Sequence, residues 1–307
     1  MSIILAIETS CDDTSIALFK DNELLALETD TSSKEYNKLG GIVPEIAARK
    51  HEESINEVFK KCLEHAKINI NDITHIAYTA TPGLPGSLHV GKIFAKSLSY
   101  VLNVKLIPID HMMGHLYSFG IGHKENIKFP FLGLVVSGGN TILYKLDGVN
   151  DHEIINATTD DAVGEVLDKI GRALEWEYPG GISLDKKYEE SKSNLKIIEH
   201  LPASTNFSFS GIKTFATNYA NNHKKFDKVA LGSSCLKWCV EDIIIKLKYY
   251  SDLYNINRIA VTGGVAANAL LNKELNKIKD KKIFICERKY CGDNAAMIGF
   301  YTSLLIY

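Results

Sequence analysis

The stretch IILAIETSCDDTSIALF at residues 3–19 decides the fold, together with its counterpart FLGLVVSGGNTILYKL at residues 131–146. In both stretches a continuous apolar run leads into a polar turn and then into a second strand-like run. An apolar run without alternation is typical of a strand that is buried on both faces. A third predicted strand follows each copy, over 24–29 and over 154–159, and both are closed by Thr-Asp. The chain therefore contains one β-rich unit twice.

The downstream segments repeat as well, each time as strand, helix and strand. They are 73–79, 90–102 and 105–109 in the first copy, and 258–262, 268–279 and 282–286 in the second. Repeats of this length are domains rather than solenoid units. Strands that alternate with helices predict mixed α/β sheets covered by helices. We therefore expect two lobes with a central cleft.

The first lobe is expected to cover residues 1–129, with a final apolar helix over 294–307 that packs back onto it. The second lobe, 130–293, carries a helical insertion at about 160–227. Within this insertion the pattern predicts helices over 162–175 and 186–199, joined by a Pro-Gly loop at 178–181. A helix over 43–66 and a long helix over 229–250 complete the pattern.

Composition excludes several classes of protein. Of the 307 residues, 45% are hydrophobic and 23% are charged, which is ordinary for a globular protein. A net charge of −2 gives no global basic field for nucleic acid, although a local basic patch remains open. The six cysteines form no Cys-x-x-Cys pair, which favours reduced thiols over disulfides or a zinc ribbon. Without a signal-like or membrane-length apolar segment, we expect a cytoplasmic protein.

Two histidines follow the strand over 105–109, in the order His111-Met-Met-Gly-His115. On a helix this spacing places both imidazoles on one face, where they can hold a transition metal or simply begin the helix. The equivalent position of the second copy holds Asp293, which is either the N-cap of the final helix or a third ligand. Because two histidines and a carboxylate suit iron or zinc, we predict that these three residues bind a metal.

Two glycine turns occupy matching strand ends, Ser137-Gly138-Gly139 and Gly263-Gly264. Ligands of such sheets lie beyond the carboxyl ends of the strands, and backbone N–H groups in turns can cradle a phosphate or an oxyanion. Ordinary tight-turn chemistry is the alternative. Asn268 opens the next helix as a cap, a nucleotide ligand or both. Two such turns fit a nucleotide that spans the cleft.

Acidic side chains at the first turn and on the insertion helix are further candidates for buried carboxylates, with solvated surface acids as the alternative. They are Glu8, Asp12 and Asp13, and Asp161, Glu165 and Asp168.

Three other motifs lack a residue that their chemistry requires. A zinc peptidase needs Glu after its first histidine, where this chain has Met112; the Walker-like run 86–92 is followed by Ile93 instead of Ser or Thr; and Ser210-Gly-Ile-Lys213 lacks the partner motifs of acyl-serine enzymes.

Together these motifs resemble one family, the bacterial tRNA N6-adenosine threonylcarbamoyltransferases (TsaD), over essentially the whole chain. The resemblance is carried by Ile7-Glu-Thr-Ser-Cys-Asp-Asp-Thr14, His111-Met-Met-Gly-His115, Val136-Ser-Gly-Gly-Asn-Thr141, Gly164-Glu-Val-Leu-Asp168, Tyr178-Pro-Gly-Gly181, Phe207-Ser-Phe-Ser-Gly-Ile-Lys-Thr214, Gly263-Gly-Val-Ala-Ala-Asn268 and Cys291-Gly-Asp-Asn294.

The resemblance implies a duplicated actin-like ATPase fold (ASKHA, RNase H-like). It implies that His111, His115 and Asp293 hold one Fe²⁺ per subunit, with zinc as the alternative, and that an adenine nucleotide binds in the cleft. It also implies substrate contacts from nine residues: Val135, Val136, Ser137, Gly138, Gly139, Asp168, Gly181, Asp185 and Asn268.

The implied reaction transfers a threonylcarbamoyl group from L-threonylcarbamoyladenylate to N6 of adenosine 37 in tRNAs that read ANN codons, and it releases AMP. We expect Asp12 to accept the amine proton. The implied partners are tRNA, an inactive paralogue (TsaB-like) and a P-loop ATPase (TsaE-like). Candidate tRNA contacts are Lys186, Lys187, Lys224, Lys225, Lys228, Lys279, Lys281 and Lys282, with ordinary solvated lysines as the alternative.

Two other functions fit the same fold: a nucleotide-dependent conformational module and a small-molecule kinase. Proteins of both kinds hold magnesium mainly through phosphates and acids. A site with two histidines, one carboxylate and open positions argues against both alternatives.

Overall fold

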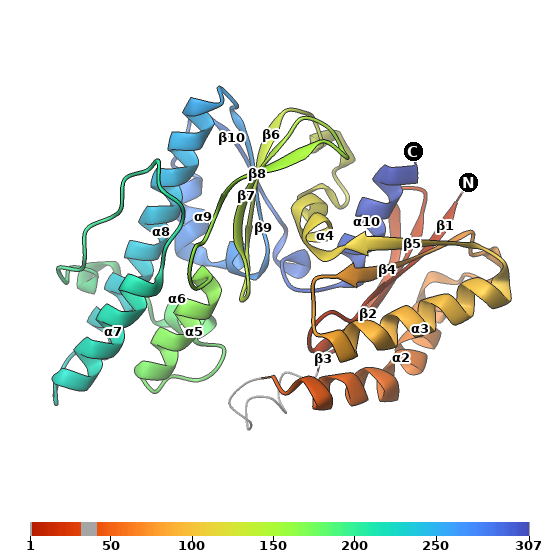
Figure 1. Ribbon diagram of the computed structural model, residues 1–307, viewed down its shortest axis with the longest axis horizontal. Helices are drawn as coiled ribbons and strands as arrows, with labels where there is room; N and C mark the ends of the chain where they lie inside the picture. The colour runs from red at the N-terminus through yellow and green to blue at the C-terminus, as the bar shows by residue number, and fades with distance from the viewer. Residues whose placement is uncertain (1, 32–41, 307) are drawn as a thin grey trace. The chain divides into compact units, whose positions relative to one another are not determined.

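The computed structural model describes residues 2–31 and 42–306 (Figure 1). These residues divide into two compact units, one within 1–128 and 289–307 and the other at 129–288. Across the described ranges, every helix is too short or too polar to span a bilayer.

The first unit is built on a five-stranded sheet of order β3-β2-β1-β4-β5. The central strand β1 is antiparallel to β2 and parallel to β4. The elements are β1 (Ile3–Glu8), β2 (Asp13–Lys20), β3 (Glu23–Thr31), α2 (Pro44–Ala66), β4 (His75–Thr81), α3 (Pro85–Leu102), β5 (Lys105–Asp110), α4 (His111–Tyr117) and α10 (Ala295–Ile306), with short 3-10 turns at Ile70–Asp72, Ser118–Gly120, Lys124–Asn126 and Arg288–Tyr290.

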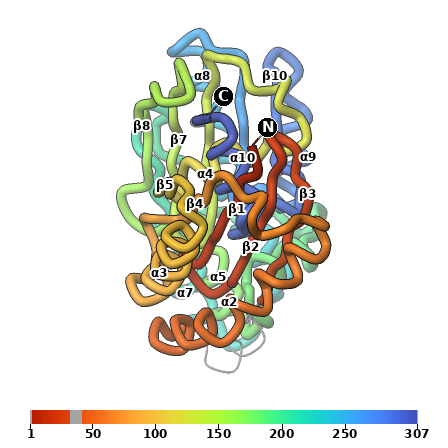
Figure 2. The backbone as a smooth tube through the Cα atoms, turned by 90° about the vertical axis from the view of Figure 1, so that its right-hand side faces the viewer, coloured from red at the N-terminus to blue at the C-terminus, as the bar shows by residue number. Residues whose placement is uncertain are grey.

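Helices cover both faces of β1, which explains why its sequence shows no alternation. Ile3, Leu5 and Ile7 share one hydrophobic core with α2 and α3, which pack against each other (Figure 1 and Figure 2). On the opposite face α10 packs so closely that a Cβ at Gly299 would meet Phe19 at 2.6 Å and Ala6 at 3.1 Å. The final helix therefore belongs to the core of the first unit.

The second unit repeats this plan with the sheet order β10-β9-β6-β7-β8. Its central strand β6 is antiparallel to β7 and parallel to β9, as β1 is to β2 and β4. The predicted duplication and α/β class are confirmed. The elements are β6 (Phe131–Val136), β7 (Thr141–Leu146), β8 (His152–Ala157), α5 (Val163–Ala173), α6 (Gly180–Lys187), α7 (Ser210–Asn222), α8 (Lys228–Leu253), β9 (Arg258–Thr262), α9 (Ala269–Leu275) and β10 (Lys282–Ile285), with 3-10 turns at Glu190–Lys192 and Gly264–Ala267.

The insertion differs from the prediction. The helix expected over 186–199 is wrong: α6 begins at Gly180, inside the expected loop, and ends at Lys187. Apart from the 3-10 turn at Glu190–Lys192, the following segment has no regular secondary structure, and side chains of α8 satisfy part of its backbone. The hydroxyls of Ser233 and Ser234 accept from the amides of Glu189 and Leu195, and the Trp238 indole donates to the carbonyl of residue 198. Apolar spacing alone carries no signal for this competition between side chains and helix.

A candidate metal centre and a set of substrate residues

The helix that carries both histidines starts where its cap dictates. β5 ends at Asp110, whose carboxylate accepts hydrogen bonds from the amides of Met112 (2.8 Å) and Met113 (3.1 Å). This cap satisfies two N–H groups that the helix itself cannot pair. α4 therefore begins at His111, and His115 lies one turn later on the same face.

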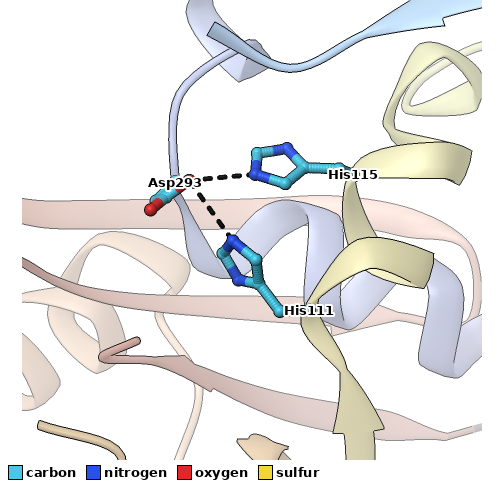
Figure 3. Close-up of side chains that lie close together, drawn as sticks. All are labelled: His111, His115 and Asp293. Atoms are coloured by element: carbon cyan, nitrogen blue, oxygen red, sulfur yellow. Dashed lines mark hydrogen bonds and ion pairs between the residues drawn. The ribbon is translucent and has the colours of Figure 1, made fainter. Parts of the chain in front are cut away.

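The two imidazoles and one carboxylate converge on a single point. His115 Nε2 lies 2.9 Å from Asp293 Oδ1, and His111 Nε2 lies 3.5 Å from the same oxygen. One ligand atom of each residue lies within 4.8 Å of the others, and Figure 3 shows both rings projecting from α4 toward Asp293. The rings meet edge to face, with centroids 4.7 Å apart.

The capping interpretation of Asp293 is settled by its neighbour. α10 begins at Ala295, and Asn294 accepts a hydrogen bond from the amide of Met297 at 3.2 Å. Asn294 is thus the residue that caps the helix. The Asp293 carboxylate is left to face the histidines.

Glu8 holds the His111 ring through the ring nitrogen that faces away from Asp293. It is fully buried at the end of β1, and its Oε2 lies 3.1 Å from His111 Nδ1. Its other oxygen accepts from the amide of Ser10 at 2.5 Å, and the hydroxyl of Thr79 also donates to the carboxylate. With the Nδ1 proton directed at Glu8, Nε2 is the ring nitrogen of His111 that can bind a metal beside Asp293.

His115 is held differently. Its side chain is fully buried, and within the described residues its Nδ1 has no hydrogen-bond partner. Packing and the contact with Asp293 therefore set the orientation of this ring.

In the second unit, the predicted substrate residues on β6 have buried side chains, so only their backbone can face a ligand. Val135 and Val136 are fully buried in the sheet. The turn that follows them is closed by a hydrogen bond from the Ser137 amide to the carbonyl of residue 140 at 2.8 Å. A Cβ at Gly138 or Gly139 would meet nothing within 4 Å, so the peptide groups at the tip of this turn are open.

Two close approaches position this turn. A Cβ at Gly164, in the first turn of α5, would lie 2.4 Å from the Ser137 carbonyl oxygen. Gly263 has φ +90°, and a Cβ there would lie 2.4 Å from the Val136 oxygen. Only glycine permits both the backbone conformation and the approach at Gly263. The second glycine turn therefore packs directly against the end of the strand that leads into the first.

The remaining predicted residues link α5, α6 and α9. The Asp168 carboxylate accepts from the amide of Gly181 at 2.9 Å, and Asp185 accepts from the amide of Ala269 at 3.0 and 3.1 Å. Asn268 caps α9 by accepting from the amide of residue 271 at 2.9 Å. Each of these side chains therefore has a structural role, and their substrate roles stay predictions.

Comparison with known proteins matches residues 23–300 to the model of the family TsaD, described as tRNA N6-adenosine threonylcarbamoyltransferase. The enzyme of that name from Ureaplasma parvum is 48% identical over 99% of this chain and 95% of its own length. The enzyme from Malacoplasma penetrans is 44% identical over 97% of both chains. This chain belongs to the TsaD family.

Solved structures agree on the fold. Two structures of HypF, one of them from T. kodakarensis, superpose with TM-scores of 0.64 and 0.66 and cover 99% of this chain. This chain in turn covers 55% and 48% of those proteins, at 13% identity. The superpositions confirm the predicted actin-like ATPase fold class.

Electrostatics at the metal centre favour a charged, proton-poor carboxylate. Burial alone would raise the pKa of Asp293, but the charge and hydrogen bonds of His111 and His115 hold it far below its usual range. Burial would lower the pKa of His111, yet Glu8 and Asp293 raise it well above its ordinary value. Glu8, His111 and Asp293 thus form an ion cluster in the metal-free protein.

The donor set fits a divalent transition metal. Two Nε2 atoms and one carboxylate oxygen form a compact group, and Glu8 supplies the hydrogen-bonded carboxylate that commonly backs a ligand histidine. The sequence marked Glu8 only as a buried-carboxylate candidate. Its position at the end of a fully apolar strand was the signal.

Asp12 lies on the β1–β2 turn, half-buried, and burial raises its pKa, with the charge of Asp293 acting in the same direction. Burial, together with the charges of Asp12 and Asp293, raises the pKa of its neighbour Asp13 to about 7. A carboxylate with such a pKa matches the requirement for a general base near neutral pH. Asp13 is therefore chemically suited to accept a proton near neutral pH, and the predicted role of Asp12 as proton acceptor stays a prediction.

Other candidates resolve into ordinary structure. Asp161 and Glu165 pair with Lys169 at 2.9 and 2.7 Å. Ser210 donates to Asp160 rather than to a lysine. The Walker-like run 86–92 lies inside helix α3, where no phosphate-binding loop exists.

Proposed function

We propose that this chain transfers the threonylcarbamoyl group of L-threonylcarbamoyladenylate to N6 of adenosine 37 in tRNAs that read ANN codons, forming t6A37 and releasing AMP. The observation that carries the proposal is the convergence of His111, His115 and Asp293 in a member of the TsaD family. The convergence involves side chains 178 positions apart in the sequence, which chance helix capping does not explain.

His111, His115 and Asp293 would hold one Fe²⁺, with zinc as the alternative. A bound metal of this kind supplies Lewis acidity and a template for the donor's oxygens. Glu8 keeps the proton on Nδ1 of His111 and so keeps Nε2 available.

Residues of the chain supply the other requirements. The exocyclic amine of adenine is a poor nucleophile, so its proton must be accepted as the new bond forms; Asp12 is the proposed acceptor. The open N–H groups of Gly138 and Gly139 are proposed to stabilise charge on the carbonyl oxygen. The donor's adenosine is proposed to lie against Asp168, Gly181, Asp185 and Asn268, with backbone contacts from Val135 and Val136.

The proposed setting is the cytoplasm. The proposed partners are tRNA, an inactive TsaB-like paralogue and a TsaE-like P-loop ATPase. The near-neutral net charge of −2 supports a need for partners in tRNA binding.

A reconstituted reaction tests the proposal. The chain is incubated with labelled threonine, bicarbonate, ATP, a donor synthase, the partner proteins and tRNA, and the tRNA is digested to nucleosides. We expect labelled t6A from the wild type and none from His111→Ala. His123→Ala, which alters an exposed histidine of the same unit, is the matched control and should keep full activity. A His111→Ala variant with full transfer would refute the metal assignment.

A further inference from the structure

An open cavity of about 420 Å³ lies between α5 and α7 in the second unit. Its volume falls within the range of roughly 300–1,000 Å³ that is usual for ligand sites. Three cationic side chains line it, Lys169 and Arg172 from α5 and Lys213 from α7, and no acidic side chain is among its lining residues. None of the predicted substrate residues lines this cavity.

Asp161 holds two of these cations at the cavity wall. Its Oδ1 lies 2.9 Å from Lys169 Nζ, and its Oδ2 pairs with Lys213 Nζ. The hydrogen bonds from Lys213 and Lys169 lower the pKa of Asp161, so the bridging carboxylate stays charged. Glu165 also pairs with Lys169, at 2.7 Å. The acids that pair with Lys169 and Lys213 do not line the cavity, so the charged side chains that line it are all cationic.

Arg172 connects this cavity to the predicted substrate residues. It is exposed and lies one helical turn after Asp168 on α5. Burial raises the pKa of Asp168, and the charge of Arg172 is one of the influences that oppose this rise, so the two groups are near each other. A planar guanidinium can donate two parallel hydrogen bonds to a phosphate.

Basic and aromatic side chains continue along α7 beyond the cavity. Lys224 and Lys225 are exposed just past the end of the helix, and His223 stacks on Tyr219 with ring centroids 4.2 Å apart. α7 continues for nine positions beyond Lys213, to Asn222, which corresponds to about 14 Å along the helix, and Lys224 lies two positions further. Cations interleaved with aromatic rings over such a length suit a nucleic-acid backbone better than a single free anion.

We propose that the cavity between α5 and α7 binds a backbone phosphate of the RNA substrate, with Arg172, Lys169 and Lys213 as its cationic contacts. The inference rests on the proposed function and adds to it a place where RNA is held. It adds Arg172, Lys169 and Lys213 to the lysines singled out by the sequence, of which Lys224 and Lys225 are exposed just beyond α7.

The test uses the full chain with its partner proteins. In Arg172→Gln, KM for tRNA should rise about tenfold, the size of effect that corresponds to about 1.4 kcal/mol. The salt dependence of stem-loop RNA binding should lose about one unit of slope. kcat and KM for the adenylate donor should stay unchanged. Arg172→Lys should recover the slope, and Lys277→Gln, an exposed lysine on α9's C-terminal side, is the matched control.

Three outcomes would overturn the inference: an unchanged KM for tRNA, an equal loss in Lys277→Gln, or a rise in KM for the donor instead of the tRNA. Inorganic phosphate is titrated as a competitor of stem-loop binding to separate RNA from a free anion. Tight phosphate binding that Arg172→Gln abolishes without any effect on RNA would assign the cavity to a small anion. RNA binding is measured without the transfer reaction, so a failure of the proposed function appears separately, as absent transfer by the wild type.

Discussion

The turn after β1 and the turn after β6 occupy the same place in two copies of one sheet, yet they are built from different groups. The first is made of side chains: Glu8 is buried and fixes His111, and Asp12 and Asp13 follow it. The second is made of backbone, with open space at Gly138 and Gly139. The same fold thus carries a buried ionic site in one unit and an open hydrogen-bonding turn in the other.

This difference teaches that topology decides where a site lies but not what it does. Both turns lie at the carboxyl end of a central strand, where ligands of such sheets bind. The chemistry depends on a few residues placed on that shared framework. Substitutions in the two turns should therefore impair different properties of the protein.

The largest expected effect is in the ionic site. His115→Ala removes a predicted ligand and leaves Asp293 without its 2.9 Å contact. Transfer should fall at least about a hundredfold, because even groups that only support metal ligands commonly cost 10–100-fold. Labelled t6A formation in the reconstituted reaction measures this, and a variant within about twofold of the wild type would contradict the assignment.

Glu8→Gln tests the support behind the site. The amide keeps the volume but loses the charge that fixes the His111 ring. Metal affinity should drop roughly 10–100-fold while the chain stays folded. A metal-competition titration measures the affinity, with the exposed Glu125→Gln as control. Equal affinities in both variants would show that Glu8 does not act on the metal.

Metal affinity should also depend on pH in a defined direction. Glu8 and Asp293 raise the pKa of His111 in the metal-free protein. A proton therefore still competes with the metal for His111 at pH values above the ordinary histidine pKa of 6.5. Affinity should rise about tenfold per pH unit until the raised pKa is passed, if one proton is displaced. The metal-free chain should show the opposite trend, because a raised histidine pKa stabilises the fold at low pH and loses that contribution as pH rises through it. Metal titrations and melting curves from about pH 5 to about pH 9 check the direction of both trends.

The smallest expected effects are on stability, and they differ between two glycines at the turn after β6. Gly164→Ala places a methyl group 2.4 Å from the Ser137 oxygen and should cost about 1–3 kcal/mol in the free energy of unfolding. Gly138→Ala meets nothing within 4 Å and should stay within about 0.5 kcal/mol. Thermal or denaturant unfolding compares them. Equal losses would show that the turn is not fixed by α5.

Much of this comparison was accessible from the sequence. Continuous apolar runs identified the central strands because burial on both faces leaves no alternation, and the repeat of strand order followed. Alignment of the two copies predicts Asp293 as a third ligand but leaves a cap role open; the structure excludes the cap role, because Asn294 caps α10. The segment after Lys187 was mispredicted because the serines of α8 that hold it lie some 40 residues away in the sequence.

Metal content tests the central claim most directly. Wild type and Asp293→Ala are loaded anaerobically with Fe²⁺, freed of excess metal and analysed by mass spectrometry, with melting curves as a check of folding. We expect about one metal ion per wild-type chain, as the three convergent ligands require, and none in the folded variant. A folded Asp293→Ala chain that keeps one equivalent would contradict a metal site built on His111, His115 and Asp293.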